Sequence, residues 1–324
     1  MTKAIRIHET GGPEVMIWED VPDRQPGPGE ALVRHGAVGV NFIDVYHRTG
    51  LYPAALPTVL GLEAAGTVEA VGPGVVEVQV GDRVAYAGGP LGAYAERRVI
   101  PADRLVPLPH DISDVQAAGM MLKGMTAQYL LRRTFPVAAG DTVLIHAAAG
   151  GVGLILCQWA KHLGATVIGT VGSEEKAALA KAHGCDHPIL YKSHDFVARV
   201  RELTDDAGVP VVYDGVGADT FLKSLDCLRP LGMMVSFGQS SGKIPPVDLG
   251  ILSAKGSLFV TRPTLMTYTA QRQDLMASAV ELFDVVRHGF VRIEVGATRP
   301  LAEAADAHRD LVGRRTTGST VLLP

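Results

Sequence analysis

A strand-like run that ends in a cluster of glycines constrains the fold of this chain more than any other feature. The run Leu144–Ala147 leads into Gly150, Gly151 and Gly153. From Val152 onward, apolar residues recur at positions 152, 155, 156, 159, 160 and 163, the spacing of a helix packed on a sheet. Strand, small-residue turn and helix in this order predict a dinucleotide-binding unit, in which N–H groups at the helix start hold a pyrophosphate.

The turn is a variant of the G-x-G-x-x-G pattern, because Ala148 stands where the first glycine would be. A tight turn without a ligand is the alternative interpretation, and the strand–turn–helix context argues against it. The surrounding window, Val143–Ala160, contains no Asp, Glu, Lys or Arg. Its glycine cluster divides it, so a strand and a buried helix explain it better than a membrane span of about 20 apolar residues.

Composition narrows the class of protein. The chain has 324 residues, of which 47% are apolar and 20% charged, values that predict about two ordered domains. Its net charge of −4 argues against a dedicated nucleic-acid binder. Cys157, Cys185 and Cys227 are too few and too scattered for a disulfide framework. The N-terminal segment lacks the apolar core of a signal peptide, so we expect a cytoplasmic protein.

The pattern of predicted elements changes along the chain. The first third contains short strands broken by glycine and proline, which predict a compact antiparallel β unit. A capping box at Ser113–Gln116 opens a helix. From about residue 123, strands alternate with helices, as in a doubly wound parallel sheet. The strand-like Ser319–Leu323 is expected to return to the first domain, which would make that domain discontinuous.

The end of the second predicted strand of the alternating region indicates which nicotinamide cofactor binds. An NAD site carries an acidic residue there for the ribose hydroxyl, whereas this strand ends in Gly169–Ser173. Ser173 and Lys176 could hold a 2′-phosphate by hydrogen bond and charge, and Tyr191 follows the next strand-like run. Glu174 and Glu175 oppose this interpretation, unless they only stabilise the first turn of a helix. The pattern favours NADPH.

A catalytic zinc site is not predicted. Such a site needs three protein ligands, often with cysteine among them, and no cysteine precedes Cys157. Leu62, between Gly61 and Glu63, stands where a coordinating histidine would be expected. His35 and His47 are isolated, and Glu63 is interpreted as a structural carboxylate.

Several longer motifs are shared with one protein family. The chain resembles the zinc-independent quinone oxidoreductase (zeta-crystallin-like) branch of the medium-chain dehydrogenase/reductase superfamily, especially its bacterial NADPH:quinone reductases. The resemblance covers essentially the whole length. It rests on the segments 40–46, 48–53, 61–66, 122–126, 146–153, 212–214, 236–238 and 260–263.

This resemblance implies an α/β fold in two domains. A GroES-like, β-rich catalytic domain would comprise residues 1–122 and 260–324, and a Rossmann NADP-binding domain residues 123–259. Family members are commonly homodimers joined edge to edge through the Rossmann sheets. Together with the glycine turn, the resemblance places these residues at the cofactor: Asn41, Tyr129, Gly150, Gly151, Val152, Gly172, Ser173, Lys176, Tyr191, Val216, Gly238, Gln239, Ser240, Phe259, Val260, Thr261 and Arg314.

The implied activity is reduction of a quinone by NADPH, without a metal, in the cleft between the domains. Asn41, Tyr46 and Tyr52 are expected around the acceptor. The Asn41 amide and a tyrosine hydroxyl could stabilise charge or relay a proton, or the tyrosines could serve only as aromatic walls. One-electron and two-electron transfer both stay open. So do two other functions: an NADPH-dependent enone or alkenal (enoyl) reductase, and a non-enzymic NADPH-binding protein of crystallin or RNA-associated type.

Overall fold

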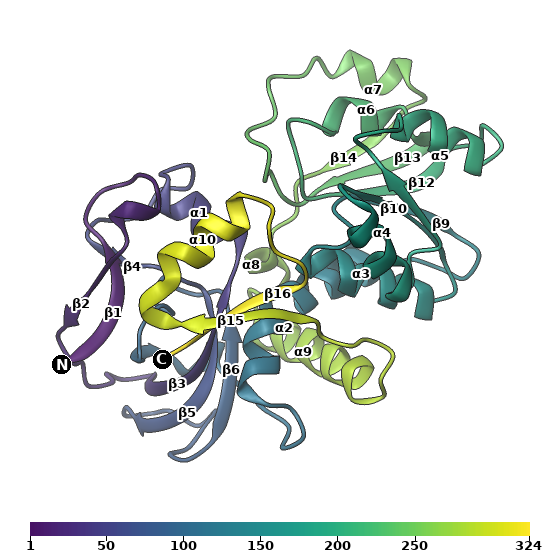
Figure 1. The fold of residues 1–324 in the computed structure, drawn as a ribbon. Coiled ribbons are helices and arrows are strands. Elements are labelled where there is room, and N and C mark those ends of the chain that lie inside the picture. Colours follow the sequence, from purple (N-terminus) through teal and green to yellow (C-terminus); the bar gives the residue numbers. More distant parts are fainter. The chain divides into compact units, whose positions relative to one another are not determined.

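The structure is a computed structural model that describes residues 1–324, and it divides into two compact units. Unit 1 comprises Met1–Met125, Tyr268–Arg287 and Ile293–Pro324. Unit 2 comprises Thr126–Thr267 and His288–Arg292. Each unit has its own sheet structure (Figure 1) and its own core of buried apolar side chains.

Unit 1 is built from two sheets. The smaller has the order β2-β1-β4, and the larger has the order β15-β16-β3-β5-β6-β8, with β7 also paired to β3. The strands are β1 (Thr2–Ile7), β2 (Ile17–Val21), β3 (Glu30–Val40), β4 (Thr58–Val59), β5 (Glu63–Val71), β6 (Arg83–Ala87), β7 (Arg97–Pro101), β8 (Val106–Pro107), β15 (Val295–Pro300) and β16 (Ser319–Leu323).

The last strand of the chain completes this unit. β16 pairs antiparallel with β3, with Val321 opposite Gly39, as the sequence predicts. A core of buried aliphatic and aromatic side chains, including Ile5, Val33 and Leu322, joins the two sheets to helix α10. The β unit is therefore discontinuous in sequence because its large sheet needs strands from both ends of the chain.

Helices cover the sheets and connect the units. Those with residues in unit 1 are α1 (Phe42–Arg48), α2 (Asp114–Tyr129), α8 (Leu265–Tyr268), α9 (Arg272–Arg287) and α10 (Ala304–Val312), with short 3₁₀ turns at Pro13–Val15, Ala102–Arg104 and Leu301–Glu303. The predicted cap of α2 is confirmed, because the Ser113 hydroxyl accepts the N–H of Gln116 at 3.2 Å.

Unit 2 is the predicted doubly wound parallel sheet. Its six strands have the order β11-β10-β9-β12-β13-β14, and every neighbouring pair is parallel. They are β9 (Thr142–Ile145), β10 (Thr166–Val171), β11 (His187–Leu190), β12 (Val209–Asp214), β13 (Leu228–Ser236) and β14 (Phe259–Thr261).

Helices pack on the sheet of unit 2 and bury its apolar strands (Figure 1). They are α3 (Gly151–His162), α4 (Glu174–Ala182), α5 (Phe196–Leu203), α6 (Phe221–Leu225) and α7 (Gly250–Ala254), with a π-helix at Leu130–Thr134 that continues α2. One core cluster joins α5 and α6 to side chains such as Leu144 and Val212 of the central strands. No helix of the chain has the length and apolar character needed to cross a membrane.

The bounds of the two compact units differ from the predicted domain bounds in three segments, one of which is residues 288–292 in unit 2. α2 continues through residue 122 without a break, and residues 123–125 belong to unit 1. β14 pairs with β13, so residues 260–267 belong to unit 2. The first boundary falls inside helix α2, and the second follows the paired strand β14. Neither boundary is a glycine- or proline-rich linker that the sequence would reveal.

Candidate functional site

The glycine turn of unit 2 has a backbone conformation that only small residues allow. Ala147 has φ +53°, in the left-handed region, so β9 ends at Ile145 and not at the predicted residue 147. A Cβ on Gly153 would lie 2.2 Å from the carbonyl oxygen of Ala147, far inside contact distance. Glycine at position 153 therefore lets the first turn of α3 pack directly against the end of the strand.

The start of α3 has no side-chain cap. Gly150 is its N-cap residue, and α3 has no acidic side chain in its first turn. By contrast, the Ser173 hydroxyl caps α4, and the Asp195 carboxylate caps α5. The first N–H groups of a helix have no partner within the helix, and they carry the positive end of its dipole. Their arrangement at α3 suits a pyrophosphate.

Most of the predicted cofactor residues lie beyond the carboxyl ends of the parallel strands. In a doubly wound sheet, ligands bind at this edge, where the strand order reverses, and here the order reverses between β9 and β12. The structure brings to this edge Gly150, Gly151 and Val152 after β9, Gly172, Ser173 and Lys176 after β10, Tyr191 after β11, Val216 after β12, and Gly238, Gln239 and Ser240 after β13.

The residues predicted to hold a 2′-phosphate lie beside one another. A Cβ on Gly172 would lie 2.9 Å from the Tyr191 hydroxyl oxygen, so the phenol occupies the space that a side chain would fill. The Ser173 hydroxyl accepts the backbone N–H of Lys176 at 3.3 Å. Ser173 and Tyr191 are exposed, and Lys176 is partly exposed. Glu174 and Glu175 lie in the first turn of α4, where acidic side chains favour the helix dipole.

Two loops at the same edge support each other. The Asp214 carboxylate accepts the N–H of Val216 at 2.7 Å, which shapes the loop after β12. The N–H of Ser240 donates to the carbonyl of Gly215 at 3.1 Å. A Cβ on Gly238 would lie 2.6 Å from that same carbonyl oxygen. Glycine at position 238 therefore allows the loop after β13 to pack on the loop after β12.

The edge strand β14 is open on one side. Phe259 is 55% exposed and Val260 41% exposed, and Thr261 is partly exposed. The following Arg262 donates through Nη1 to the carbonyls of Ser236 and Gly238, each at 2.8 Å. Sequence reasoning did not single out Arg262 as the residue that holds the loop after β13.

Tyr129 and Arg314 are two further predicted cofactor residues, and they do not belong to the loops at that edge. Tyr129 is buried at the C-terminal end of α2, next to the π-helix. Arg314 is exposed after α10 and adopts φ +56°, in unit 1.

Asn41 of unit 1 has an amide whose orientation is fixed. It is the N-cap residue of α1, and its side chain accepts the backbone N–H of Asp44 in a capping box. Its Nδ2 donates to Oε2 of Glu63 at 2.7 Å. Asn41 is 5% exposed. The oxygen therefore faces the helix backbone and one N–H faces Glu63, which leaves the second Nδ2–H as the donor for other groups.

Glu63 is the centre of a buried polar cluster. Its carboxylate accepts the N–H of Leu122 at 2.6 Å and lies 3.5 Å from the Lys123 ammonium. Lys123 also donates to the carbonyl of Val40 at 3.1 Å. Burial raises the pKa of Glu63, while the Lys123 charge and the Asn41 amide oppose that rise. A Cβ on Gly39 would lie 2.2 Å from Oε2 of Glu63, so glycine makes room for the carboxylate.

A second buried network connects Asp44 and Arg48, both on α1, through Tyr94 and His308. Tyr94 donates to Oδ2 of Asp44 at 2.9 Å, and its oxygen lies 3.0 Å from Nε2 of His308. Nδ1 of His308 lies 3.1 Å from Nη1 of Arg48. Arginine only donates, so His308 accepts at Nδ1 and donates from Nε2 to Tyr94.

Burial shifts the Asp44 carboxyl and the His308 imidazole of this network toward their neutral forms. It raises the pKa of Asp44 to about 7, against the opposing hydrogen bonds from Asn41 and Tyr94. Burial and the nearby Arg48 charge lower the pKa of His308 to about 3. The Oδ1 atom of Asp44 is buried without a hydrogen-bond partner, which is the position where a proton would be held.

The two tyrosines predicted at the acceptor form an aromatic pair. The rings of Tyr46 and Tyr52 have centroids 5.2 Å apart in an edge-to-face arrangement. Phe42 lies 6.2 Å from Tyr46, and His47 lies 5.7 Å from Tyr52. Tyr46 is 8% exposed, whereas Tyr52 is partly exposed. Asn41 and Tyr46 belong to the same short helix segment, so one element positions both.

Several residues of this region escaped prediction from the sequence. Lys123, Tyr94 and His308 were not singled out, and Glu63 was interpreted only as a structural carboxylate. The Asn-x-x-Asp spacing of Asn41 and Asp44 is a capping signal that would have found α1. Nothing in the sequence around His308 indicates its contact with Tyr94. The structure gathers no three His, Cys, Asp or Glu side chains in a geometry that could hold a metal ion.

Comparison with known proteins places the chain in a family. Residues 27–110 match the family model described as "Alcohol dehydrogenase GroES-like domain", and residues 151–284 match "Zinc-binding dehydrogenase". The chain is 56% identical to "Quinone oxidoreductase" of Pseudomonas aeruginosa, over all of both chains. It is 51% identical to "2-haloacrylate reductase" of a Burkholderia species, over 100% of this chain and 99% of that one.

A solved structure agrees with these relatives. The crystal structure of Escherichia coli quinone oxidoreductase complexed with NADPH superposes with a TM-score of 0.97 at 48% identity, over 99% of this chain and 100% of that chain. The likeness covers both units and confirms the predicted combination of a GroES-like domain with a Rossmann-like parallel sheet.

Proposed function

The chain belongs to the quinone oxidoreductase family of the medium-chain dehydrogenase/reductase superfamily, and on this premise we propose that it catalyses the NADPH-dependent reduction of quinones. The observation that carries the proposal is the uncapped, glycine-bounded start of α3 at the point where the strand order of the sheet reverses. That place suits a dinucleotide pyrophosphate. Unit 2 is then the NADP-binding domain and unit 1 the catalytic domain.

The cofactor is held mainly by backbone. The N–H groups of Gly151 and Val152 at the start of α3 bind the pyrophosphate, and Gly150 allows its close approach. The loops after β12 and β13 border the same space. The full proposed set is Asn41, Tyr129, Gly150, Gly151, Val152, Gly172, Ser173, Lys176, Tyr191, Val216, Gly238, Gln239, Ser240, Phe259, Val260, Thr261 and Arg314. When bound, NADPH supplies a hydride from its dihydronicotinamide ring.

Preference for NADPH over NADH rests on the end of β10. Ser173, Lys176 and Tyr191 surround the position where an NAD enzyme has a carboxylate for the ribose hydroxyl. The Lys176 ammonium and the two hydroxyl groups suit a phosphate instead. The two glutamates of α4 belong to the helix start and not to this position.

Asn41, Tyr46 and Tyr52 act on the acceptor. Reduction of a quinone to a hydroquinone takes one hydride and one proton, and negative charge develops on a quinone oxygen. The second Nδ2–H of Asn41 is the donor directed at that charge, because Glu63 and the helix backbone occupy the rest of the amide. Tyr46 and Tyr52 provide an aromatic wall and hydroxyl groups that could pass on the proton.

Reduction of activated alkenes is a second candidate. The full-length relative named 2-haloacrylate reductase favours it, since a halogenated acrylate accepts hydride at carbon. The same amide donor would then stabilise negative charge on the carboxylate oxygen of such an acrylate, or on the carbonyl oxygen of an enone or alkenal.

We also propose that the protein is a cytoplasmic homodimer. The exposed Phe259 and Val260 of the edge strand β14 support pairing of two sheets edge to edge, because an open apolar edge readily accepts a further strand. Light scattering of the purified protein should give twice the mass of one chain. A Val260→Lys variant should give the mass of one chain.

The activity is tested by mixing the purified protein with NADPH and 1,4-benzoquinone, 9,10-phenanthrenequinone or an enone. Loss of the dihydronicotinamide absorbance measures turnover, and the rate with NADH at equal concentration tests the cofactor preference. Quinones should be reduced faster than the enone. Cofactor binding without turnover of any acceptor would refute both enzymatic functions and support a non-enzymic NADPH-binding protein.

The role of the tyrosines is tested in the same assay. Tyr46→Phe and Tyr52→Phe keep the ring and remove the hydroxyl. If a hydroxyl relays the proton, kcat should fall and the pH profile should change. If the rings serve only as walls, the Phe variants should retain activity, whereas the Ala variants should show raised KM.

A further inference from the structure

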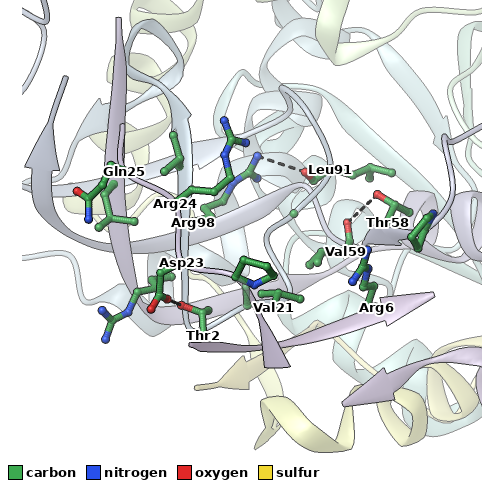
Figure 2. Close-up of a pocket in the computed structure, with 17 residues that line it drawn as sticks. Thr2, Arg6, Val21, Asp23, Arg24, Gln25, Thr58, Val59, Leu91 and Arg98 are labelled. Carbon is green, nitrogen blue, oxygen red and sulfur yellow. Dashed lines mark hydrogen bonds between the residues drawn. The ribbon is translucent and has the colours of Figure 1, made fainter. Parts of the chain in front are cut away.

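A cavity of ≈ 550 Å³ lies within unit 1, and no residue proposed to bind NADPH or the acceptor lines it. Its walls come from β1, the segment after β2, β4, the segment before β7, and β7 itself (Figure 2). All of its lining residues belong to unit 1. What it binds is therefore independent of the proposed reductase function.

The cavity carries positive charge on a chain that is acidic overall. Arg6, Arg24, Arg97 and Arg98 line it, and Asp23 is its one lining carboxylate. Asp23 already pairs with the N-terminal ammonium and accepts the Thr2 hydroxyl at 2.6 Å; these contacts lower its pKa. These contacts already balance the negative charge of Asp23. The four arginines therefore leave the cavity positively charged, although the net charge of the chain is −4.

Three of the arginines are held only loosely by carboxylates outside the cavity wall. The shortest N···O distances are 3.4 Å from Arg6 to Glu19, 3.9 Å from Arg24 to Glu30, and 3.7 Å from Arg97 to Glu69. A charge-assisted hydrogen bond is normally about 2.7–2.9 Å long. These guanidinium groups can therefore turn toward a ligand without breaking a short ion pair.

Arg98 has no carboxylate partner, although it is only 9% exposed. Its Nη2 donates to the carbonyls of Pro90 at 3.0 Å and Leu91 at 3.3 Å, and its guanidinium lies 5.2 Å from the ring centre of Tyr86. Nε and Nη1 are buried without a hydrogen-bond partner. A buried charge without a counter-ion is costly, and an anion in the cavity would offset that cost from close range.

We propose that this cavity binds a small organic oxyanion, a carboxylate or a phosphate ester. Arg6, Arg24 and Arg97 supply N–H groups in the forked geometry that matches such anions, and the buried Arg98 adds a fixed positive potential behind them. Apolar lining residues, among them Val21, Pro57, Val59 and Leu91, pack against the organic part. A cavity of this size accommodates a ligand of several hundred Å³.

The test is isothermal titration of the NADPH-saturated protein with phenyl phosphate, benzoate and inorganic phosphate, in chloride at constant ionic strength. Saturation with NADPH keeps the probes out of the cofactor site. We expect saturable binding of one equivalent, tighter for phenyl phosphate or benzoate than for inorganic phosphate. Tighter phenyl phosphate would identify a phosphate ester as the ligand, and tighter benzoate a carboxylate.

Variants locate the binding. Arg24→Gln combined with Arg97→Gln changes two exposed arginines and should weaken binding at least tenfold without altering the rate of NADPH oxidation. Arg98→Lys, which keeps the charge and loses the fork, should weaken it less. Arg199→Gln on α5 is the matched control and should leave binding unchanged. Absence of saturable binding, or equal affinity in the double variant and the control, would overturn the proposal.

Discussion

The two sets of candidate site residues, a backbone half in unit 2 and a side-chain half in unit 1, are built in opposite ways. In unit 2, the edge proposed for the cofactor is made mainly of backbone, with glycines at 150, 153, 172 and 238, and side chains are proposed chiefly for the 2′-phosphate. In unit 1, the side proposed for the acceptor is made of side chains, with Asn41 held by Glu63 and Glu63 held near Lys123. The backbone half offers a ligand a matching shape, whereas the side-chain half offers it hydrogen-bond donors in fixed positions.

One glycine in each half leaves space for an oxygen atom, but the oxygen belongs to the backbone in one half and to a side chain in the other. The absent Cβ of Gly153 makes room for the backbone carbonyl of Ala147, six residues earlier in the same motif. The absent Cβ of Gly39 makes room for a side-chain carboxylate from another strand, Glu63. The backbone half is therefore encoded locally, whereas the side-chain half depends on contacts between distant segments. Substitutions should separate these two modes.

The largest effect is expected in the side-chain half. Lys123→Met leaves the Glu63 carboxylate buried without its cation, and breaking such a pair costs about 3–5 kcal/mol. Urea denaturation should show this loss in the free energy of unfolding. The double variant Glu63→Gln/Lys123→Met should recover most of it while quinone reduction stays low, because one amide oxygen at position 63 replaces the two carboxylate oxygens that accept from Asn41 and Leu122. An equal loss in the single and double variants would contradict the buried pair.

A smaller loss is expected for the backbone half. Gly153→Ala places a methyl group against the Ala147 carbonyl, and overpacking of this kind costs about 1–3 kcal/mol. NADPH affinity should fall with it, by at least tenfold in a fluorescence titration. Gly250→Ala, in a short helix where the nearest atom is 3.3 Å away, is the matched control. Similar NADPH affinity in the two variants would show that the turn does not shape the cofactor site.

In the buried network at α1, His308 and Asp44 are expected to change the pH dependence of stability in opposite directions. Unfolded histidine takes up a proton near pH 6.5, whereas native His308 excludes it down to about pH 3, so this residue makes stability rise with pH in that window. Native Asp44 keeps its proton to about pH 7, whereas the unfolded carboxyl loses it near 3.8. Its contribution therefore falls as pH rises between those values.

Two variants separate these contributions. Between pH 4.5 and 6, His308→Gln should lower the slope of unfolding free energy against pH by up to about 1.4 kcal/mol per pH unit, and Asp44→Asn should raise it by a similar amount. Urea denaturation across this range measures both slopes. Slopes that match the wild type would mean that neither group titrates abnormally in the folded protein.

The smallest effect is expected at the exposed end of β10. Lys176→Ala should weaken NADPH about tenfold, or about 1.4 kcal/mol, and leave NADH nearly unchanged, since only NADPH carries the 2′-phosphate. Lys181→Ala, on the same helix, is the control. Calorimetric titration with both cofactors measures the difference. Equal losses of affinity for the two cofactors would show that Lys176 does not bind the 2′-phosphate.

The sequence predicted the backbone half well because its signals lie close together. Strand, glycines and helix fall within residues 144–163, and the structure confirms each of them. Even here, the strand ends two residues early, since the left-handed conformation of Ala147 has no reliable signature in an alanine. The residue assignments for the cofactor stay predictions, because the edge of a sheet identifies candidates and not contacts.

The side-chain half could be predicted only in part. Asn41, Tyr46 and Tyr52 were proposed through family resemblance, but the carboxylate that holds Asn41 lies at position 63, and the ammonium beside that carboxylate lies at position 123. No periodicity or spacing links residues so far apart. His308 is a sharper case, because its environment depends on the packing of α10 against Tyr94, which only the assembled unit defines. Long-range polar contacts are invisible to local patterns.

The pairing of β16 with β3 also orders events during synthesis of the chain. A ribosome makes β15, α10 and β16 after all of unit 2, so the parallel sheet can form while the large sheet of unit 1 still lacks its last two strands. His308 joins Tyr94 only in that final stage. A nascent chain halted after residue 292 should therefore already resist proteolysis across residues 126–267 and remain sensitive within residues 1–125.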